Sequence, residues 1–221
     1  MNKDQKLLEE RYQQICESTR EPLYFGPPNK KKSFMEWLKK LNHEVHEDGS
    51  VSIHETAYLE SKFLQRLPFN FKTVEGNFNC YNNNLTSLEG APEKVGGDFN
   101  CNNNNLTSLE GAPNSVGGDF NCVYNNLTSL EGAPNSVGGH FTCYYNNLTS
   151  LEGAPEKVGG NFNCNNNNLT SLEGAPAEIK GEFESNRFTD EDYRKYAREK
   201  RIQKKLDKEL DKEFDIDLKD F

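Results

Sequence analysis

Hydrophobic residues in the middle of the chain recur with a fixed period of 21 residues. Residues 96–116 show the unit, G-G-D-F-N-C-N-N-N-N-L-T-S-L-E-G-A-P-N-S-V, in which polar and glycine-rich stretches separate the apolar residues. A period of this length predicts a solenoid, because each unit must stack on its neighbours to bury its apolar face. The repeated cysteines mark the register of the copies: Cys80, Cys101, Cys122, Cys143 and Cys164.

Each unit predicts one short strand with alternating side chains. In the unit at 96–116, Phe99 and Cys101 are expected to point inward, whereas Asp98 and Asn100 point outward. Stacked units then predict parallel ladders of phenylalanine, cysteine and leucine. A further inward ladder is predicted for asparagine, whose amide can satisfy backbone groups left free where the chain leaves the strand. Its members are Asn83, Asn104, Asn125, Asn146 and Asn167.

The frame of the unit resembles the leucine-rich repeat, L-x-x-L-x-L-x-x-N-x-L. Phe99 and Cys101 match the two inward strand positions, and Asn104 and Leu106 match the asparagine and the final leucine. Gly96 replaces the first leucine of the frame, with an apolar valine just before it. The phrase Leu-Thr-Ser-Leu-Glu-Gly-Ala-Pro with Phe-x-Cys is similar to 21-residue leucine-rich repeats of tailed-phage and bacterial proteins.

This resemblance covers about half of the chain. It implies a repeat solenoid in the form of a short leucine-rich-repeat horseshoe, with parallel β-strands on its concave face. Together with the flanking segments it predicts helical caps at both ends. It also implies a scaffold that binds proteins.

The flanking sequences divide the chain into four expected parts. Residues 1–32 predict a leader peptide and linker, either a partner-binding tag or a disordered segment. Residues 33–75 contain a helix-start pattern and an Asp-Gly turn, and predict an N-terminal cap of a helix plus a hairpin. Residues 76–188 contain five full repeats and a degenerate sixth. Residues 189–221 predict a capping helix followed by an acidic tail, which either docks as a strand or frays.

Composition and charge exclude several classes of function. Only 33% of residues are hydrophobic, which suits a solenoid whose core is a narrow stripe. The net charge of −9 disfavours nucleic-acid binding, which needs a basic face. The sequence has no apolar stretch long enough to predict a membrane span, and the charged N-terminus lacks the apolar core of a signal peptide. We therefore expect a cytoplasmic protein, in the host cytoplasm if phage-encoded or associated with a virion.

The cysteines and histidines do not predict a cofactor or a metal site. A 21-residue period spreads the cysteines along a line, whereas metal ligands converge on a point. Disulfides between neighbouring strands are sterically conceivable, but an odd ladder of five would leave one thiol unpaired, so buried thiols are expected. His43, His46 and His54 flank the predicted hairpin without a cysteine or spaced carboxylate to complete a site.

Differences among the copies point to a binding face. The inward residues scarcely change, whereas the residue before each phenylalanine and the two residues after each cysteine vary. These rows lie on the predicted concave face, and tyrosine is favoured at interface centres. Neutral variation after duplication is the alternative interpretation. The candidate partner-binding residues are Tyr81, Asp98, Asp119, Tyr124, His140, Tyr144 and Tyr145.

Three hypotheses for the function follow. The first is a non-catalytic scaffold, phage-encoded on the strength of the resemblance, that binds a protein partner through its concave face. The second is a virion structural or decoration component that docks through the leader or the C-terminal tail. An enzyme is not expected, because the 33 residues after Phe188 cannot supply a catalytic domain.

Overall fold

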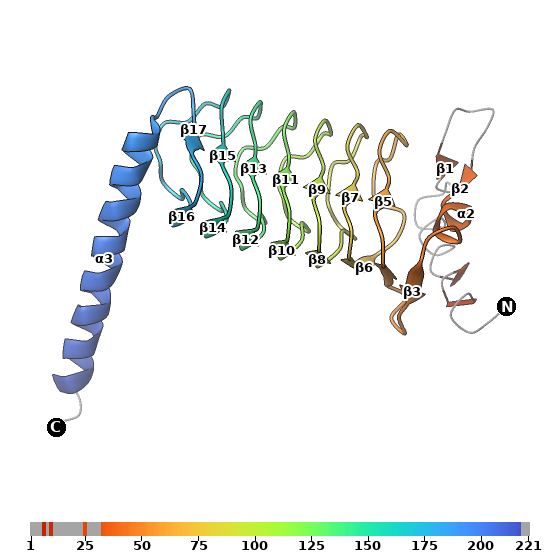
Figure 1. The fold of residues 1–221 in the computed structure, drawn as a ribbon, viewed down its shortest axis with the longest axis horizontal. Coiled ribbons are helices and arrows are strands. Elements are labelled where there is room, and N and C mark those ends of the chain that lie inside the picture. Colours follow the sequence, from red (N-terminus) through yellow and green to blue (C-terminus); the bar gives the residue numbers. More distant parts are fainter. Residues whose placement is uncertain (1–5, 8, 11–23, 26–31, 218–221) are drawn as a thin grey trace.

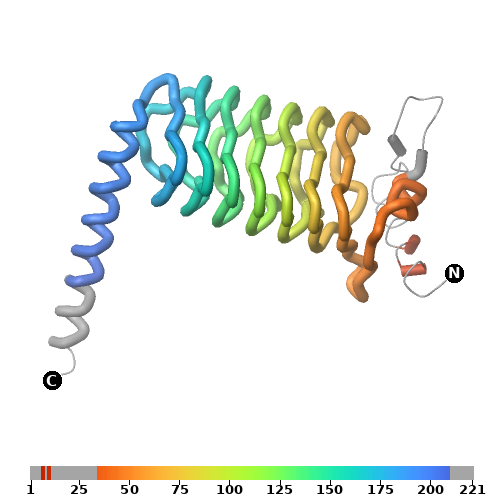
Figure 2. Tube along the Cα trace, in the orientation of Figure 1, coloured from red at the N-terminus to blue at the C-terminus, as the bar shows by residue number. Residues whose placement is uncertain are grey.

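The computed structural model describes residues 6–7, 9–10, 24–25 and 32–217 of the 221-residue chain. Its centre is a β-solenoid of about six turns, in which strands of successive turns pair in parallel (Figure 1). One 21-residue turn of this solenoid is called a coil below. Figure 2 shows the coils following one another in a single row, with the N-terminal segments at one end and a long helix at the other. The predicted repeat solenoid is therefore confirmed.

The Phe-x-Cys segments form a sheet of seven parallel strands, in register by whole coils. Phe99, for example, lies beside Phe78 in the preceding coil and Phe120 in the following one. The strands are β5 (Ala57–Tyr58), β7 (Phe78–Asn79), β9 (Phe99–Asn100), β11 (Phe120–Asn121), β13 (Phe141–Thr142), β15 (Phe162–Asn163) and β17 (Phe183–Glu184).

A second parallel sheet lies along the valine positions, where the sequence predicted no separate strand. It forms because each valine segment, after the Gly-Ala-Pro turn, pairs with the same segment of the next coil, as Val95 does with Val116. The strand β3 (His43–Val45) adds to its edge in antiparallel orientation. The parallel strands are β4 (Val51–Ile53), β6 (Phe71–Val74), β8 (Lys94–Val95), β10 (Ser115–Val116), β12 (Ser136–Val137), β14 (Lys157–Val158) and β16 (Glu178–Ile179).

The predicted ladders fill the space between the two sheets. The phenylalanine rings of neighbouring coils stack at centroid distances of 5.1 to 5.9 Å, with their planes within 11° of parallel. The cysteine and leucine ladders beside them are buried as well. The stacked phenylalanines are Phe78, Phe99, Phe120, Phe141, Phe162 and Phe183.

The predicted asparagine ladder is also confirmed. The Oδ1 atom of Asn104 accepts a hydrogen bond from the Leu85 N–H at 3.0 Å. Its Nδ2 atom donates to the carbonyl oxygens of Cys80 and Cys101, each at 3.0 Å. The corresponding asparagines of the other coils repeat these bonds, so each amide joins the backbones of two adjacent coils.

The Gly-Gly pair of each unit permits the close approach of neighbouring coils. A Cβ atom added to Gly117 would lie 2.2 Å from the Gly96 carbonyl oxygen, and one added to Gly118 would lie 2.1 Å from Asp98 Oδ1. Neither glycine has a positive φ, so the requirement is for space. Side chains larger than a hydrogen at these positions would push the coils apart.

At the N-terminal end lie the helix α2 (Phe34–Leu38) and the antiparallel hairpin of β3 and β4, in the segment for which the sequence predicted a helix plus a hairpin. The strand β4 then pairs in parallel with β6, and β5 pairs with β7. One coil therefore lies inside residues 33–75, where Ala57 and Leu59 occupy the places of phenylalanine and cysteine.

The leader contributes little to the described structure. Two short strands, β1 (Tyr24–Phe25) and β2 (Lys32–Ser33), pair in antiparallel orientation. Most of the predicted leader peptide and linker lies outside the described residues.

The helix α3 (Asp190–Asp217) begins where the sequence predicts it, but it does not cover the end of the solenoid. Figure 1 shows it projecting away from the last coil, which only its first turns contact. The helix continues through Asp217, into the segment for which a strand or a frayed tail was expected. Among its described side chains only Tyr193 and Ala197 are buried, so the packing against the last coil is confined to the start of the helix. Among the described residues, no helix combines the length and apolar composition needed to cross a membrane.

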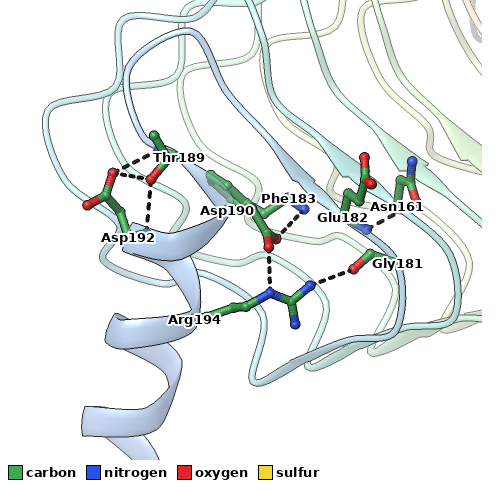
Figure 3. A network of polar contacts seen from close by, with 8 residues as sticks. All are labelled: Asn161, Gly181, Glu182, Phe183, Thr189, Asp190, Asp192 and Arg194. Carbon is green, nitrogen blue, oxygen red and sulfur yellow. Dashed lines mark hydrogen bonds and ion pairs between the residues drawn. The ribbon is translucent and has the colours of Figure 1, made fainter.

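The first turn of α3 takes the place of a further coil (Figure 3). The Asp190 carboxylate accepts the Phe183 N–H at 3.0 Å, whereas the equivalent Phe162 N–H is bonded to the Glu182 carbonyl oxygen. Arg194, which is paired with Asp190, donates to the Gly181 carbonyl oxygen at 3.4 Å. Side chains of α3 thus satisfy edge groups that a next coil would have bonded.

Candidate binding surface

Three tyrosines of neighbouring coils lie together beside the Phe-x-Cys sheet, and we call Tyr124, Tyr144 and Tyr145 the tyrosine cluster. The rings of Tyr124 and Tyr145 stack with centroids 4.7 Å apart and planes 9° from parallel. Tyr144 meets both rings edge-on, at 6.0 and 5.6 Å. Tyr124 and Tyr145 are 51% and 47% exposed. The structure thus brings three of the seven candidate residues together, while their role in binding stays a prediction.

Two members of the cluster adopt a backbone conformation that tyrosine disfavours. Tyr124 and Tyr145 have φ angles of 52° and 53°, in the left-handed region. This region costs an ordinary side chain about 1–2 kcal/mol, whereas asparagine tolerates it because its short polar side chain can bond locally. The other full coils place asparagine at this position: Asn82, Asn103 and Asn166. Tyrosine therefore stands in two adjacent coils where the fold itself favours asparagine.

Asp98, Asp119 and His140 belong to a different row, which joins the coils. Asp98 Oδ1 accepts the Asp119 N–H at 2.8 Å, and Asp119 Oδ1 accepts the His140 N–H at 2.7 Å. The Nδ1 atom of His140 accepts the Asn161 N–H at 2.8 Å, so Nε2 carries the proton of the neutral ring. We call this row, from Thr56 to Asn161, the acceptor row. Its variation has a structural reason, since Thr, Asn, Asp and His can all accept this bond.

Tyr81 is not brought to the tyrosine cluster. It is half-buried and lies three coils before Tyr144 in the same row, with Asn102 and Val123 between them. His140, another candidate residue, lies in the acceptor row. Of the seven predicted residues, the structure groups three into one exposed patch.

Two exposed aromatic residues of the first coil were missed from the sequence. Tyr58 is exposed and pairs in register with Asn79, and Phe63 is exposed with a φ of 60°. They were missed because this coil lacks the Phe-x-Cys signature. Counting back 21 residues from Asn79 to Tyr58 would have placed Tyr58 on the sheet.

The thiols of the cysteine ladder are inert. All five are free and buried, as predicted, and burial raises the pKa of each above its ordinary value, to about 12 for Cys164. A thiol kept protonated is a poor nucleophile and metal ligand. The ladder therefore contributes packing and offers no reactive group.

The histidines near the hairpin each have a separate partner. His46 Nε2 lies 2.8 Å from Ser52 Oγ, and His54 Nδ1 lies 2.9 Å from Glu75 Oε1. His43 Nδ1 lies 2.9 Å from the Leu41 carbonyl oxygen. Within the part of the chain that the structure describes, no three His, Cys, Asp or Glu side chains are grouped to hold a metal ion.

Comparison of this chain with family models, with curated proteins and with solved structures found no match. Its function is therefore inferred from the surface of the solenoid.

Proposed function

We propose that the protein is a non-catalytic scaffold that binds a protein partner through the tyrosine cluster. The observation that carries this proposal is the pair of stacked, half-exposed tyrosines at left-handed positions. Stacking of two aromatic rings contributes about 0.5–1.5 kcal/mol, which only partly offsets two strained backbones. The cluster therefore contributes little to the stability of the fold, and binding of a partner accounts for tyrosine at these two positions.

The surroundings of the cluster indicate the character of the partner surface. The same positions of the adjacent coils carry only asparagine: Asn102, Asn103, Asn165 and Asn166. Tyrosine combines a large rigid ring with a polar tip, and asparagine offers both donors and acceptors. A partner with an apolar centre and an uncharged polar rim fits this arrangement.

The proposal extends to the class of the repeat. We infer that the coils are leucine-rich repeats of a short 21-residue type arranged as a shallow horseshoe, in a protein of phage or bacterial origin. The inward asparagine of each coil supports this inference, since it bonds to the backbone of its own coil and of the preceding one. The contacts of α3 with the last coil support a capping role for its first turn.

Replacing Tyr124 and Tyr145 by asparagine tests the binding role without harming the fold. Asparagine suits the left-handed backbone. We therefore expect the free energy of unfolding of the double variant to equal that of the wild type or to exceed it by up to about 1 kcal/mol per site. A pull-down from the native host, quantified by mass spectrometry, should identify a protein retained by the wild type and lost by the variant. With that purified partner, calorimetry should show affinity reduced by about tenfold or more.

Tyr81→Asn is the matched control, because it makes the same change in the adjacent row outside the cluster. It should leave the affinity unchanged. Equal binding by wild type and the double variant would contradict the assignment of the patch. The alternative of a virion component docking through leader or tail stays a prediction, and mass spectrometry of purified particles would test it.

A further inference from the structure

The helix α3 leaves a long stretch of its surface without a partner in the chain. Tyr193 stacks on Phe183 at 5.1 Å and donates a hydrogen bond to the Pro176 carbonyl oxygen at 3.1 Å, and Ala197 is buried beside it. Every residue from Arg198 to Glu209 is exposed. In proteins, most helical stability comes from packing of an amphipathic face rather than from intrinsic propensity. The exposed part of α3 lacks such packing within the chain, and a partner would supply it.

An apolar stripe marks the side of α3 on which this partner would lie. Ile202 and Leu206, one helical turn apart, are 50% and 48% exposed. Ile202 follows Tyr193 by nine residues, or about two and a half turns at 3.6 residues per turn, so the stripe faces away from the last coil. The sequence continues the four-residue spacing with Leu210 and Phe214.

The opposite side of α3 faces the array across a groove. A groove of about 410 Å³ lies between the helix and the last coils. Lys200 and Lys204 line it from the helix, and Glu152 and Glu173 line it from the coils. Attraction between these opposite charges favours the observed orientation of α3, in which its lysines face the array. The apolar stripe is left available.

The charges along α3 identify a second copy of the same helix as the occupant. Residues 194–208 contain eight basic and two acidic residues, whereas residues 209–217 contain five acidic and one basic residue. Two copies in antiparallel orientation set each basic segment beside the acidic segment of the other. A parallel pair would set like charges together, which is destabilising.

The apolar spacing agrees with the same orientation. An antiparallel pair centred on position 208 brings position 202 level with position 214 of the second copy, and position 206 level with position 210. All four positions are apolar in the sequence: Ile202, Leu206, Leu210 and Phe214. The register that matches charge also matches hydrophobicity.

We propose that α3 pairs antiparallel with α3 of a second copy, so that the protein is a homodimer joined through its C-terminal helices. The coils take no part in this contact. The dimer would present two tyrosine clusters, and this consequence, which rests on the proposed function, would strengthen attachment to a partner with repeated sites.

The mass of the full-length protein in solution tests the dimer. Light scattering and analytical ultracentrifugation at about 1 to 100 µM should give twice the 25.2 kDa of the chain. Leu206→Glu should weaken dimerisation by about tenfold or more, because it places a charge in the apolar stripe. Lys204→Gln changes the net charge by the same amount on the opposite side of the helix, and it should leave the dimer intact. A monomer across this range, or a dimer equally stable with Leu206→Glu, would overturn the proposal.

Disulfide trapping tests the orientation. Chains with Ile202→Cys are mixed with chains with Phe214→Cys, both in a Cys16→Ser background. The antiparallel register predicts a disulfide between the two kinds of chain, whereas disulfides between chains of one kind would contradict it. These measurements use no binding partner, so they can fail while the proposed function of the tyrosine cluster holds. Capture of another protein by α3 in place of self-association would likewise overturn the dimer.

Discussion

Asn104 shows how one buried polar side chain joins neighbouring coils. Its amide bonds to one N–H and three carbonyl groups of the backbone at the point where the chain leaves the strand. These groups have turned away from the ladder of the sheet, so the side chain supplies the partners that they would otherwise lack. Repetition in each coil makes asparagine as necessary as the apolar residues around it.

We expect Asn104→Ala to lower the free energy of unfolding by about 2–4 kcal/mol, because several buried backbone groups would lose their partners at about 1–3 kcal/mol each. Denaturation by urea, followed by circular dichroism, measures the change. Asn105→Ala is the control, since that side chain is exposed and its loss should change stability by at most about 0.5 kcal/mol. Equal effects of the two substitutions would argue against the ladder.

The buried thiols predict a loss of stability in alkali. Thiols of the unfolded chain ionise near pH 9.0, whereas burial raises the pKa of the folded thiols well above this value. Their stabilisation is complete below pH 9.0 and falls as the pH rises, by about 1.4 kcal/mol per pH unit for each thiol. Cys122→Ala should make the decline of unfolding free energy above pH 9.0 shallower by that amount. An unchanged slope would contradict the burial of Cys122.

At the scale of the elements, the start of α3 makes some of the contacts with the last coil that a further coil would make. Asp190 accepts the bond that a strand carbonyl would accept, and Tyr193 continues the stack of phenylalanine rings. Thr189 and Asp192 exchange hydrogen bonds around the first turn of the helix, which fixes its direction. The Phe183 N–H and the Gly181 carbonyl, two polar groups at the edge of the last coil, are thereby given partners.

Removal of the Asp190 carboxylate should loosen this end of the solenoid. Burial by itself would raise the pKa of Asp190, but the Phe183 N–H and the Arg194 guanidinium together lower it below 3.8. Its contribution is therefore present above pH 3.8 and is lost as the pH falls through the lower folded value. We expect Asp190→Ala to reduce the free energy of unfolding by about 1–2 kcal/mol at neutral pH.

Hydrogen exchange at the Phe183 amide should become faster in the Asp190→Ala variant, because that N–H loses its acceptor. The matched control is Glu191→Ala, which removes an exposed carboxylate from the same turn. An effect of the control as large as that of Asp190→Ala would show that helix charge, rather than the edge bond, is responsible.

At the scale of the whole molecule, the solenoid behaves as a row of equivalent units. From β7 to β15, each strand pairs only with strands of the preceding and following coils, so stability is expected to be a sum of coil and interface contributions. A unit of the correct length should therefore be removable. A unit of any other length would misplace every ladder beyond the cut.

Deletion of residues 97–117 removes 21 residues and rejoins the chain at equivalent positions. We expect a folded protein with one coil fewer and an intact tyrosine cluster. The slope of its unfolding free energy against urea concentration should be about one sixth smaller than that of the wild type, because less surface is exposed on unfolding. Deletion of residues 97–116 removes one residue less, shifts the inward positions onto the outer face and should prevent cooperative folding. Similar behaviour of the two deletions would contradict a stacked register.

Much of this architecture could be predicted from the repeat alone. The period established the stacking, and alternation about Phe99 and Cys101 established the inward ladders and the outward rows. The same comparison of copies located the tyrosine cluster. The second sheet was missed, because Val95 and its equivalents form two-residue strands that depend on hydrogen bonds to the next coil. The first coil was missed because Ala57 replaces the signature phenylalanine.

Local periodicity decided which residues are buried, since a stacked unit repeats the same environment at the same position in every coil. Contacts between residues that are far apart in the sequence decided the hydrogen bonds between coils and the direction of α3. The acceptor row became visible only when Asp98 and His140 were seen to bond to backbone N–H groups 21 residues away. The direction of α3 likewise depends on Asp190, Tyr193 and Arg194 meeting the last coil. Such contacts join positions that are distant in the sequence, and no local pattern specifies them before the chain is folded.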